Sequence, residues 1–386
     1  MKQPTHWING GVIFAMALLI AGPALAQIKE EPIDWNRAGE LHRRSQRGEK
    51  LTAAEQAYYD RARKQREAGQ QRQPAAANPN APLTNAFKAT PLTELGGEKY
   101  KGEDGGLYGG GRNEPPAAHL AAARKESAHI RPLDAQGKPS ADGKIALVSI
   151  GMSNTTQEFS EFVRLGNADA TKSPRVVLID GAQGAMEALA WATLPRPWDT
   201  LMSRLQTADV STQQVQVAWV KLARAGPARL GEFPKHAEEM KAHEVKILQM
   251  LRQRFPNLRV AYLSNRIYAG YATSQLNPEP YAYESAFTVR WLIQDQIAGK
   301  AELSFGSSKD GAKSPLLLWG PYLWANGAKP NKDGLVWLPE DFTGDYTHPG
   351  NSGRRKVAEQ LLKFFKTDSV AKAWFLKTGG AAGSSQ

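Results

Sequence analysis

Short apolar runs recur between residues 145 and 319, and each has the length of a β-strand. The runs cover residues 145–150, 176–179, 215–220, 258–263 and 316–319. Runs of this length are typical of strands that are buried on both faces of a sheet. Between and after them lie segments with the apolar spacing of helices, at residues 155–165, 185–193, 236–255, 283–297 and 353–365. In the last of these segments, Val357, Leu361 and Phe365 fall on one helical face.

This alternation of strand and helix patterns predicts an α/β fold. Helical connections join parallel strands, so the five runs predict an α/β/α sandwich with a mainly parallel, five-stranded sheet. In sheets of this kind the reactive groups gather beyond the carboxyl ends of the strands. The residues that follow the predicted strands are therefore the candidates for a functional site.

The first 26 residues have the layout of a secretory signal peptide. Lys2 is followed by an apolar run from Val12 to Ile20 and then by the small-residue sequence Ala24-Leu25-Ala26. That run is shorter than the roughly 20 residues that a membrane-spanning helix needs, so a retained anchor is the weaker interpretation. We expect cleavage after Ala26, a periplasmic or secreted mature protein, and no stable membrane insertion after cleavage.

Four further regions follow the predicted signal peptide (residues 1–26). Residues 27–69 are expected to form a helical segment that is broken near Arg47–Gly48, with Thr52 and Glu55 spaced as a capping box. Residues 70–143 begin as a Gln-, Pro- and Ala-rich linker and continue as a Gly-rich loop, which we expect to wrap the core, with plain disorder as the alternative. The predicted α/β domain covers residues 144–378, and residues 379–386 form a flexible tail.

The composition removes several classes of chemistry. The chain has no cysteine, so disulfides, thiol nucleophiles and thiolate metal ligands are excluded. The net charge is +11, but the basic runs near residues 43–66 are mixed with acidic residues, which disfavours nucleic-acid binding. The sequence contains no Walker loop, dinucleotide fingerprint, calcium loop or His-Glu-x-x-His motif. We therefore expect no cofactor and no metal.

Two loops carry residues that suit nucleophilic catalysis. The sequence Gly151-Met-Ser153-Asn-Thr follows the first predicted strand and places a hydroxyl at the carboxyl edge of the sheet and at the start of a helix. Asp345-Tyr-Thr-His348 precedes the final helix, and a turn there can fold the carboxylate back on the imidazole. A serine needs a base to remove its proton, and the base needs a carboxylate to orient it. The hypothesis is therefore a catalytic triad of Ser153, His348 and Asp345. The alternative is that Ser153 only caps the helix and that His348 lies in an ordinary turn.

The region from about residue 144 to residue 365 resembles the SGNH (GDSL-type) hydrolases on these two motifs. The sequence IGMSN looks like the first block of the family, with Met152 where Asp is usual, and DYTHP looks like its last block. The resemblance implies a flavodoxin-like fold and an ester-hydrolysing site formed by Ser153, Asp345 and His348.

The resemblance leaves one part of the site open, the oxyanion hole. It implies that backbone N–H groups of Ser153 and Gly184 hold the oxyanion, with Gly181 as the other choice for the second block. The family's third block supplies an Asn side chain after the third strand, but here the sequence is Ala-Arg224-Ala-Gly and contains no Asn. The candidates to replace that donor are Arg224, Asn154 and Asn265.

The loop after the fourth predicted strand is rich in residue types that suit sugar binding. Its sequence SNRIYAGY contains Asn265, Arg266 and Tyr268, which suit hydrogen bonding and stacking on sugar rings. The alternative is that its aromatic residues only pack the loop onto the domain. The residues considered for substrate binding are therefore Asn154, Arg224, Asn265, Arg266 and Tyr268.

These observations predict an exported serine esterase with a Ser-Asp-His triad, acting on an acylated small molecule or carbohydrate. Two alternatives stay open: a non-catalytic envelope protein that binds glycan or a partner on the same fold, and an O-acyltransferase.

Overall fold

The computed structural model describes residues 51–72, 87–306 and 311–377, together with residues 33, 34, 37, 38, 41 and 44. The chain divides into two compact units, residues 1–72 and 73–386. The predicted signal peptide, the break near Arg47–Gly48 and the tail at 379–386 lie outside the described residues. Within the described ranges, none of the helices combines the length and the apolarity needed to cross a bilayer.

The first unit contains helix α2 (Ala53–Arg72) and a small apolar cluster. The predicted capping box is confirmed, because the Thr52 backbone N–H donates to Glu55 Oε2 at 2.8 Å and the Glu55 N–H donates to Thr52 Oγ1 at 3.3 Å. Tyr58 and Ala62 of α2 pack with Ala38 and Leu41. Among the described residues of this unit, the apolar contacts are therefore few.

The second unit is built around a five-stranded sheet in which every strand pairing is parallel. Its strands lie in the order β2 (Val176–Ile179), β1 (Ile145–Gly151), β3 (Val215–Lys221), β4 (Val260–Leu263) and β5 (Leu316–Trp319). Every residue of β1, β3, β4 and β5 is buried, which explains their continuous apolar sequences. The predicted α/β fold and its parallel five-stranded sheet are confirmed.

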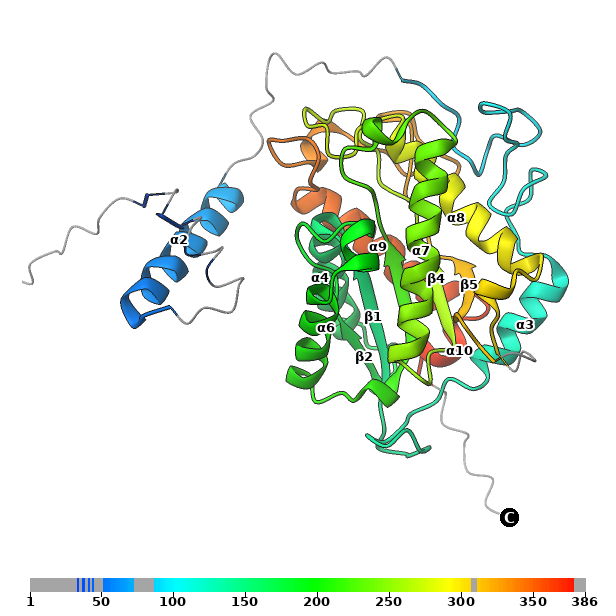
Figure 1. The fold of residues 1–386 in the computed structure, drawn as a ribbon, viewed down its shortest axis with the longest axis horizontal. Coiled ribbons are helices and arrows are strands. Elements are labelled where there is room, and N and C mark those ends of the chain that lie inside the picture. Colours follow the sequence, from blue (N-terminus) through cyan, green and yellow to red (C-terminus); the bar gives the residue numbers. More distant parts are fainter. Residues whose placement is uncertain are drawn as a thin grey trace, which may run out of the picture. The chain divides into compact units, whose positions relative to one another are not determined.

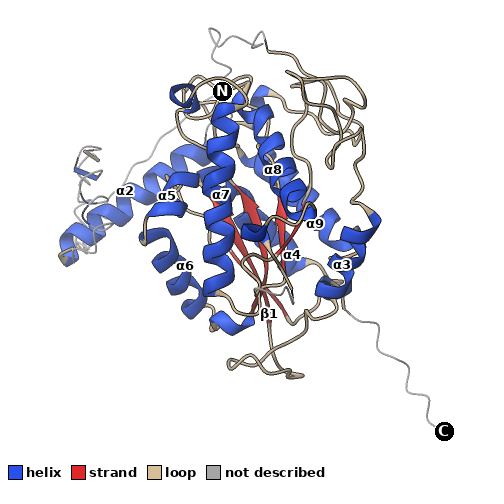
Figure 2. Cartoon of the chain, turned by 45° about the vertical axis from the view of Figure 1, so that its right-hand side comes forward, coloured by secondary structure: helices blue, strands red, loops and turns tan. Residues whose placement is uncertain are grey.

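Helices cover the sheet on both faces (Figure 1). Figure 1 shows α7 in front of the sheet and α9 behind it, and Figure 2 shows the same arrangement from a second side. Helix α4 packs against α9, while α7 packs against α5 and α8. The bounds of the helices in this unit are α3 (Ala117–Ser127), α4 (Ser153–Ala168), α5 (Ala188–Thr193), α6 (Arg196–Thr207), α7 (Lys235–Arg254), α8 (Tyr281–Ile297), α9 (Asn351–Thr367) and α10 (Lys372–Phe375). Short 3₁₀ turns span Thr212–Gln214, Pro227–Leu230, Ala301–Leu303 and Pro339–Asp341.

Three of these helices, α3, α6 and α10, lie where the sequence pattern predicted none. Helix α6 has Pro197 in its first turn, where proline is tolerated because the N–H there has no intrahelical acceptor. Helix α3 is rich in alanine and has no broad apolar stripe, yet it contacts β4 and β5. Helix α5 begins at Ala188 rather than at the predicted residue 185, because Ala185 has a positive φ of 64°.

Residues 87–143, which precede β1, pack on the same core as the sheet. Leu92, Tyr108 and Ile130 are buried in the main apolar cluster. The Leu92 N–H donates to the Tyr322 hydroxyl at 3.0 Å, and the Trp319 indole N–H donates to the Leu107 carbonyl at 2.7 Å. These contacts bind the segment to the residues at and after β5.

The chain order of the strands fixes where a ligand site is expected. The chain passes from β1 outward to β2 and then crosses back to β3 on the other side of β1. The order of the strands therefore reverses between β1 and β3, and crevices beyond the carboxyl ends of such strands are the usual ligand sites of open α/β sheets.

Candidate active site

Ser153 lies at the reversal point, directly after β1. The strand ends at Gly151, Met152 is the N-cap residue, and Ser153 opens α4 two residues before the predicted start of that helix. The first backbone bond of α4 runs from Thr156 N–H to the Met152 carbonyl at 3.0 Å. The N–H groups of residues 153–155 consequently have no intrahelical acceptor and lie at the positive end of the helix.

Gly151 permits the close approach of β1, β3 and α4 at this point. A Cβ atom on residue 151 would lie far inside contact distance of the Lys221 carbonyl oxygen and of the Thr155 hydroxyl. With glycine in place, the Thr155 hydroxyl donates to the Lys221 carbonyl at 2.7 Å. This contact fixes the first turn of α4, and with it Ser153, against the end of β3.

The structure brings Ser153, His348 and Asp345 into one hydrogen-bonded series. Ser153 Oγ lies 2.7 Å from His348 Nε2, and His348 Nδ1 lies 2.5 Å from Asp345 Oδ2. The two ring nitrogens thus contact the hydroxyl on one side and the carboxylate on the other. This arrangement allows the imidazole to accept the serine proton while the carboxylate holds the other ring N–H.

The second oxygen of Asp345 organises its own loop. Asp345 Oδ1 accepts hydrogen bonds from the backbone N–H groups of Thr347 and His348, both at 3.0 Å, and from the Thr343 hydroxyl at 2.8 Å. Tyr346 has a positive φ of 51°, and this left-handed turn folds the loop back on the carboxylate. Burial opposes ionisation of Asp345, but the hydrogen bonds from His348 and the loop outweigh it and hold the pKa of Asp345 well below its usual range.

Two neighbouring segments hold this loop against the rest of the domain. The Asn154 side-chain amide donates to the Thr347 carbonyl at 2.9 Å and is buried. On the other side the hydroxyls of Ser274 and Thr347 lie 2.8 Å apart, and the Thr273 hydroxyl donates to the Asp345 carbonyl at 3.2 Å. The loop that carries the imidazole is therefore attached both to α4 and to the segment after β4.

A cavity of about 380 Å³ opens beside Ser153 and His348. Small and apolar residues form much of its wall, and two arginines and one glutamate add charge. The lining residues are Met152, Ser153, Asn154, Ala185, Glu187, Ala223, Arg224, Ala225, Arg266, Leu276, Asn277, Thr347 and His348. A cavity with an apolar wall and a few fixed polar groups suits a small organic group.

The structure places the residues considered for substrate binding in different surroundings. Asn154, Arg224 and Arg266 line the cavity. Asn265 is fully buried elsewhere: its Oδ1 accepts from the Leu323 N–H at 2.9 Å and its amide donates to the Arg266 carbonyl at 3.1 Å. Tyr268 lines a second cleft, which shares no lining residue with the cavity at Ser153.

Gly184, the residue considered for the oxyanion hole, does not line the cavity. Its neighbour Ala185 does, with a positive φ of 64°. The N–H of Gln183 is already bound to the Gly151 carbonyl at 3.1 Å, and the N–H of Gly181 to the Ser149 hydroxyl at 3.1 Å. The N–H of Gly184, by contrast, forms no hydrogen bond within the described chain.

The two arginines of the cavity differ in their polar partners. Arg224 Nη1 lies 2.7 Å from Glu187 Oε2, and its Nη2 lies 3.5 Å from Glu239 Oε1. Arg266 is 2% exposed and donates through Nε to Asn277 Oδ1 at 3.3 Å. Its Nη1 is buried and has no hydrogen-bond partner among the described residues. Sequence reasoning missed Glu187 and Asn277, since neither lies in a motif that marks it.

A buried ion pair lies behind the start of α4. Lys221 at the end of β3 and Glu158 in α4 both have fully buried side chains, and Lys221 Nζ lies 2.6 Å from Glu158 Oε1. Burial lowers the pKa of Lys221 to about 8, although the Glu158 carboxylate favours its charged form. The pair joins the strand and the helix on which Ser153 depends.

Comparisons with known proteins give similarity only at the level of distant structures. No protein-family model and no curated protein sequence matches the chain. A lipase from a goat rumen metagenome is 15% identical with a TM-score of 0.34, over 57% of this chain and 97% of the lipase. A carbohydrate esterase is 13% identical with a TM-score of 0.35, over 59% of this chain and 70% of the esterase. A salicylyl-acyltransferase from a tetracycline biosynthetic pathway is 12% identical with a TM-score of 0.29, over 59% of this chain and 55% of that protein. The function of the chain is therefore inferred from the geometry of Ser153, His348 and Asp345.

Proposed function

We propose that this protein is a serine esterase in which Ser153, His348 and Asp345 form the catalytic triad. The observation that carries the proposal is the pair of contacts at His348, 2.7 Å to the Ser153 hydroxyl and 2.5 Å to the Asp345 carboxylate. A serine at the N-terminus of a helix, beside a cavity and within hydrogen-bond distance of an oriented imidazole, has the groups that acyl transfer requires.

In the proposed reaction, Ser153 Oγ attacks the ester carbonyl carbon while His348 Nε2 takes the hydroxyl proton. The carbonyl oxygen becomes an oxyanion, which the Ser153 N–H stabilises; the second donor in this proposal is the N–H of Gly184, which precedes the cavity residue Ala185 and forms no backbone bond within the described chain. When the intermediate collapses, the bond to the alcohol oxygen breaks and His348 returns the proton to the leaving alcohol. Water then attacks the acyl-serine with His348 as the base, and the acid leaves with Ser153 restored.

The cavity favours a short acyl group. Its volume of about 380 Å³ is at the small end of the range for ligand sites, which run from about 300 to 1,000 Å³. Met152, Ala185 and Leu276 give it an apolar wall next to the nucleophile. We infer an exported enzyme whose substrate is a carbohydrate that carries small acyl esters. If a sugar hydroxyl replaces water in the second step, the same site transfers the acyl group.

A direct test is hydrolysis of p-nitrophenyl acetate by the wild-type protein and by two serine variants. Ser153→Ala removes the nucleophile and should abolish turnover. Ser203→Ala is the matched control, because Ser203 is exposed on α6 and does not line the cavity. Wild type and Ser203→Ala should hydrolyse the ester at equal rates. Equal activity in Ser153→Ala would exclude the triad.

A second candidate function, glycan binding without catalysis, is favoured by the side chains around the oxyanion position. The Asn154 amide is bound to the Thr347 carbonyl, and Arg224 is bound to Glu187. Neither side chain is therefore free to replace the third-block Asn, and loss of one oxyanion donor typically costs about 10²–10³ in rate. Release of acetate from acetylated xylan or pectin is the assay that separates a carbohydrate esterase from a glycan-binding protein without catalysis. Binding of these polymers without release of acetate or transfer to an added sugar would identify the non-catalytic protein.

A further inference from the structure

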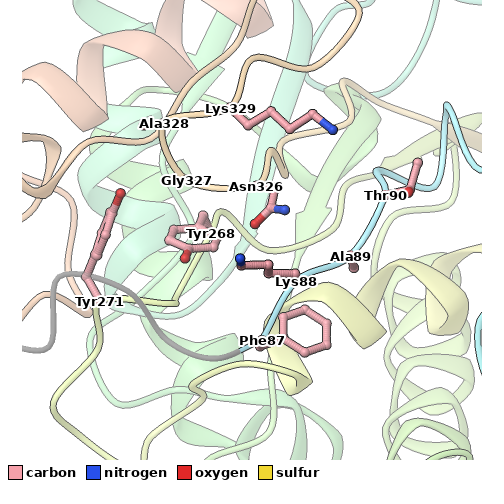
Figure 3. Close-up of a pocket in the computed structure, with 10 residues that line it drawn as sticks. All are labelled: Phe87, Lys88, Ala89, Thr90, Tyr268, Tyr271, Asn326, Gly327, Ala328 and Lys329. Carbon is pink, nitrogen blue, oxygen red and sulfur yellow. The ribbon is translucent and has the colours of Figure 1, made fainter.

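A second cleft, of about 590 Å³, opens on the segment that follows β4 (Figure 3). Tyr268 and Tyr271 of this segment line the cleft, while Arg266 and Asn277 of the same segment line the cavity at Ser153. One stretch of chain thus forms part of the wall of both cavities. A ligand held in the cleft would contact the segment that also supports the proposed catalytic loop through Ser274.

The cleft is cationic. Its lining contains Lys88 and Lys329 and no Asp or Glu, which gives it a net charge of +2. Both lysines are exposed, and neither forms an ion pair within the described part of the chain. Figure 3 shows the Lys88 ammonium directed toward Tyr268. An anionic ligand would therefore meet two ammonium groups that the described protein leaves unpaired.

The neutral side chains of the cleft also have free polar groups. Tyr268 is only 4% exposed, and its hydroxyl forms no hydrogen bond with any described residue. The Asn326 carboxamide likewise has no hydrogen-bond partner among the described residues. In Figure 3 the Asn326 side chain lies between the two lysines, and the Tyr268 ring lies beside it on the side of Tyr271. Unpaired hydroxyl and carboxamide groups of this kind suit the hydroxyls of a sugar.

The tyrosine wall is held in place by its own contacts. The Tyr271 hydroxyl donates to the Trp337 carbonyl at 3.0 Å. The ring centroid of Tyr268 lies 5.0 Å from that of Tyr271 and 6.0 Å from that of Trp324. Gly327 faces these rings at a positive φ of 59°, and a Cβ there would come within 3.1 Å of the Tyr271 hydroxyl. A rigid aromatic wall loses little conformational entropy when a ligand binds.

Carboxylates act on both tyrosines of the cleft. Burial raises the pKa of Tyr268, and the Glu279 carboxylate raises it further. Burial raises the pKa of Tyr271, and the carboxylates of Glu340 and Asp341 raise it further. Asp341 is paired with Lys356 at 2.5 Å, whereas Glu340, at the Tyr271 end, has no ion pair among the residues that the structure describes. An anionic group of the ligand therefore belongs near Lys88 and Lys329 rather than near Tyr271.

We propose that this cleft binds carboxylated sugar units of an acidic glycan. The carboxylates face Lys88 and Lys329, the sugar hydroxyls bind Asn326 and the Tyr268 hydroxyl, and the apolar edge of a ring contacts the tyrosines. In the cavity at Ser153, Glu187 balances Arg224, and Arg266, whose Nη1 has no hydrogen-bond partner among the described residues, leaves the same sign of charge. The proposal deepens the proposed function by naming the class of acylated glycan, an acidic one, that the esterase acts on.

The test is a binding measurement on the full-length protein carrying Ser153→Ala, so that no ester is cleaved. Isothermal titration calorimetry would compare trigalacturonate with its methyl-esterified form, which has the same rings but no charge. We expect trigalacturonate to bind about tenfold or more tightly than the methyl ester. Adding Lys88→Glu and Lys329→Glu should remove that preference. The affinity for the methyl ester should stay within about threefold of its value in the protein that carries Ser153→Ala alone.

Two further variants separate the cleft from general charge effects. Lys246→Glu with Lys363→Glu makes the same change in net charge on exposed residues of α7 and α9 and should leave trigalacturonate binding unchanged. Tyr268→Phe keeps the ring and removes a hydroxyl that has no partner among the described residues, and it should weaken the binding of both ligands. Equal affinity for the acid and the ester, or equal losses in the two lysine pairs, would overturn the proposal. Because the protein tested lacks Ser153, these results do not depend on whether the wild type hydrolyses esters.

Discussion

Replacing Asp345 with Asn changes one contact of the carboxylate and leaves its other contacts available. Asp345 Oδ1 accepts from two backbone N–H groups and from the Thr343 hydroxyl, and an amide oxygen accepts the same bonds. At the position of Oδ2, which lies 2.5 Å from His348 Nδ1, the variant would carry an amide NH₂. Two donors cannot share a hydrogen bond, so His348 would move its proton from Nδ1 to Nε2.

That tautomer removes the base from the proposed reaction. His348 Nε2 would then donate to Ser153 instead of accepting its proton. The corresponding carboxylate-to-amide change in the serine-protease triad lowers kcat by about 10⁴-fold. At about 1.36 kcal/mol per factor of ten, this is about 5.4 kcal/mol of transition-state stabilisation. We expect Asp345→Asn to lower kcat for p-nitrophenyl acetate by about 10³–10⁴-fold and to change KM by less than about threefold, since Asp345 does not line the cavity.

Steady-state kinetics and thermal unfolding of the variant test this reasoning together. Three of the four hydrogen bonds to the side chain survive unchanged and the fourth reverses, with the amide NH₂ donating to His348 Nδ1, so the protein should remain folded. Asp333→Asn is the matched control, because Asp333 is exposed and does not line the cavity. A folded Asp345→Asn protein that keeps kcat within about tenfold of wild type would refute the role given to Asp345.

Three further predictions concern stability. The pKa of Asp345 is held below its usual range in the folded protein. Its contribution to folding stability is therefore fully present above the unfolded-state pKa of about 3.9 and is lost as the pH falls through the folded-state pKa. The Tm difference between wild type and Asp345→Asn should thus be constant from about pH 7 to 5 and shrink below about pH 4. Lys221→Met leaves Glu158 buried without its partner and should cost about 3–5 kcal/mol in urea unfolding. The double variant with Glu158→Leu should recover most of this loss, and no recovery would contradict the ion-pair account. Gly151→Ala forces a Cβ against the Lys221 carbonyl and should lower the free energy of unfolding by about 1–3 kcal/mol. In the control Gly344→Ala the new Cβ meets no atom within 4 Å, and the free energy of unfolding should stay within about 0.5 kcal/mol of wild type. Equal effects of the two substitutions would contradict the close packing at Gly151.

The strands were predictable because burial on both faces leaves an unbroken apolar signature. The run at 145–150 corresponds to β1, which extends one residue further to Gly151, and the runs at 176–179 and 316–319 match β2 and β5. Helices α3 and α6 were missed for local reasons. One is alanine-rich without a broad apolar face, and the other begins beside two prolines that favour a loop interpretation.

The juxtaposition of the proposed triad followed from topology. Ser153 follows a central strand and His348 precedes a helix that packs against α4, so the parallel sheet brings residues 195 positions apart together. The cavity wall was not predictable in this way. Glu187 and Asn277 reach the cavity through loop packing, and the Asn154 amide turned inward to bind the Thr347 carbonyl, as no spacing rule indicates.

Covalent labelling with a fluorophosphonate, followed by mass spectrometry of the labelled peptide, tests the central claim most directly. A triad of Ser153, His348 and Asp345 predicts one adduct, located on Ser153, which is absent when His348 is replaced by Ala. No adduct in the wild-type protein, or an adduct on another serine with Ser153 unmodified, would contradict the proposed active site.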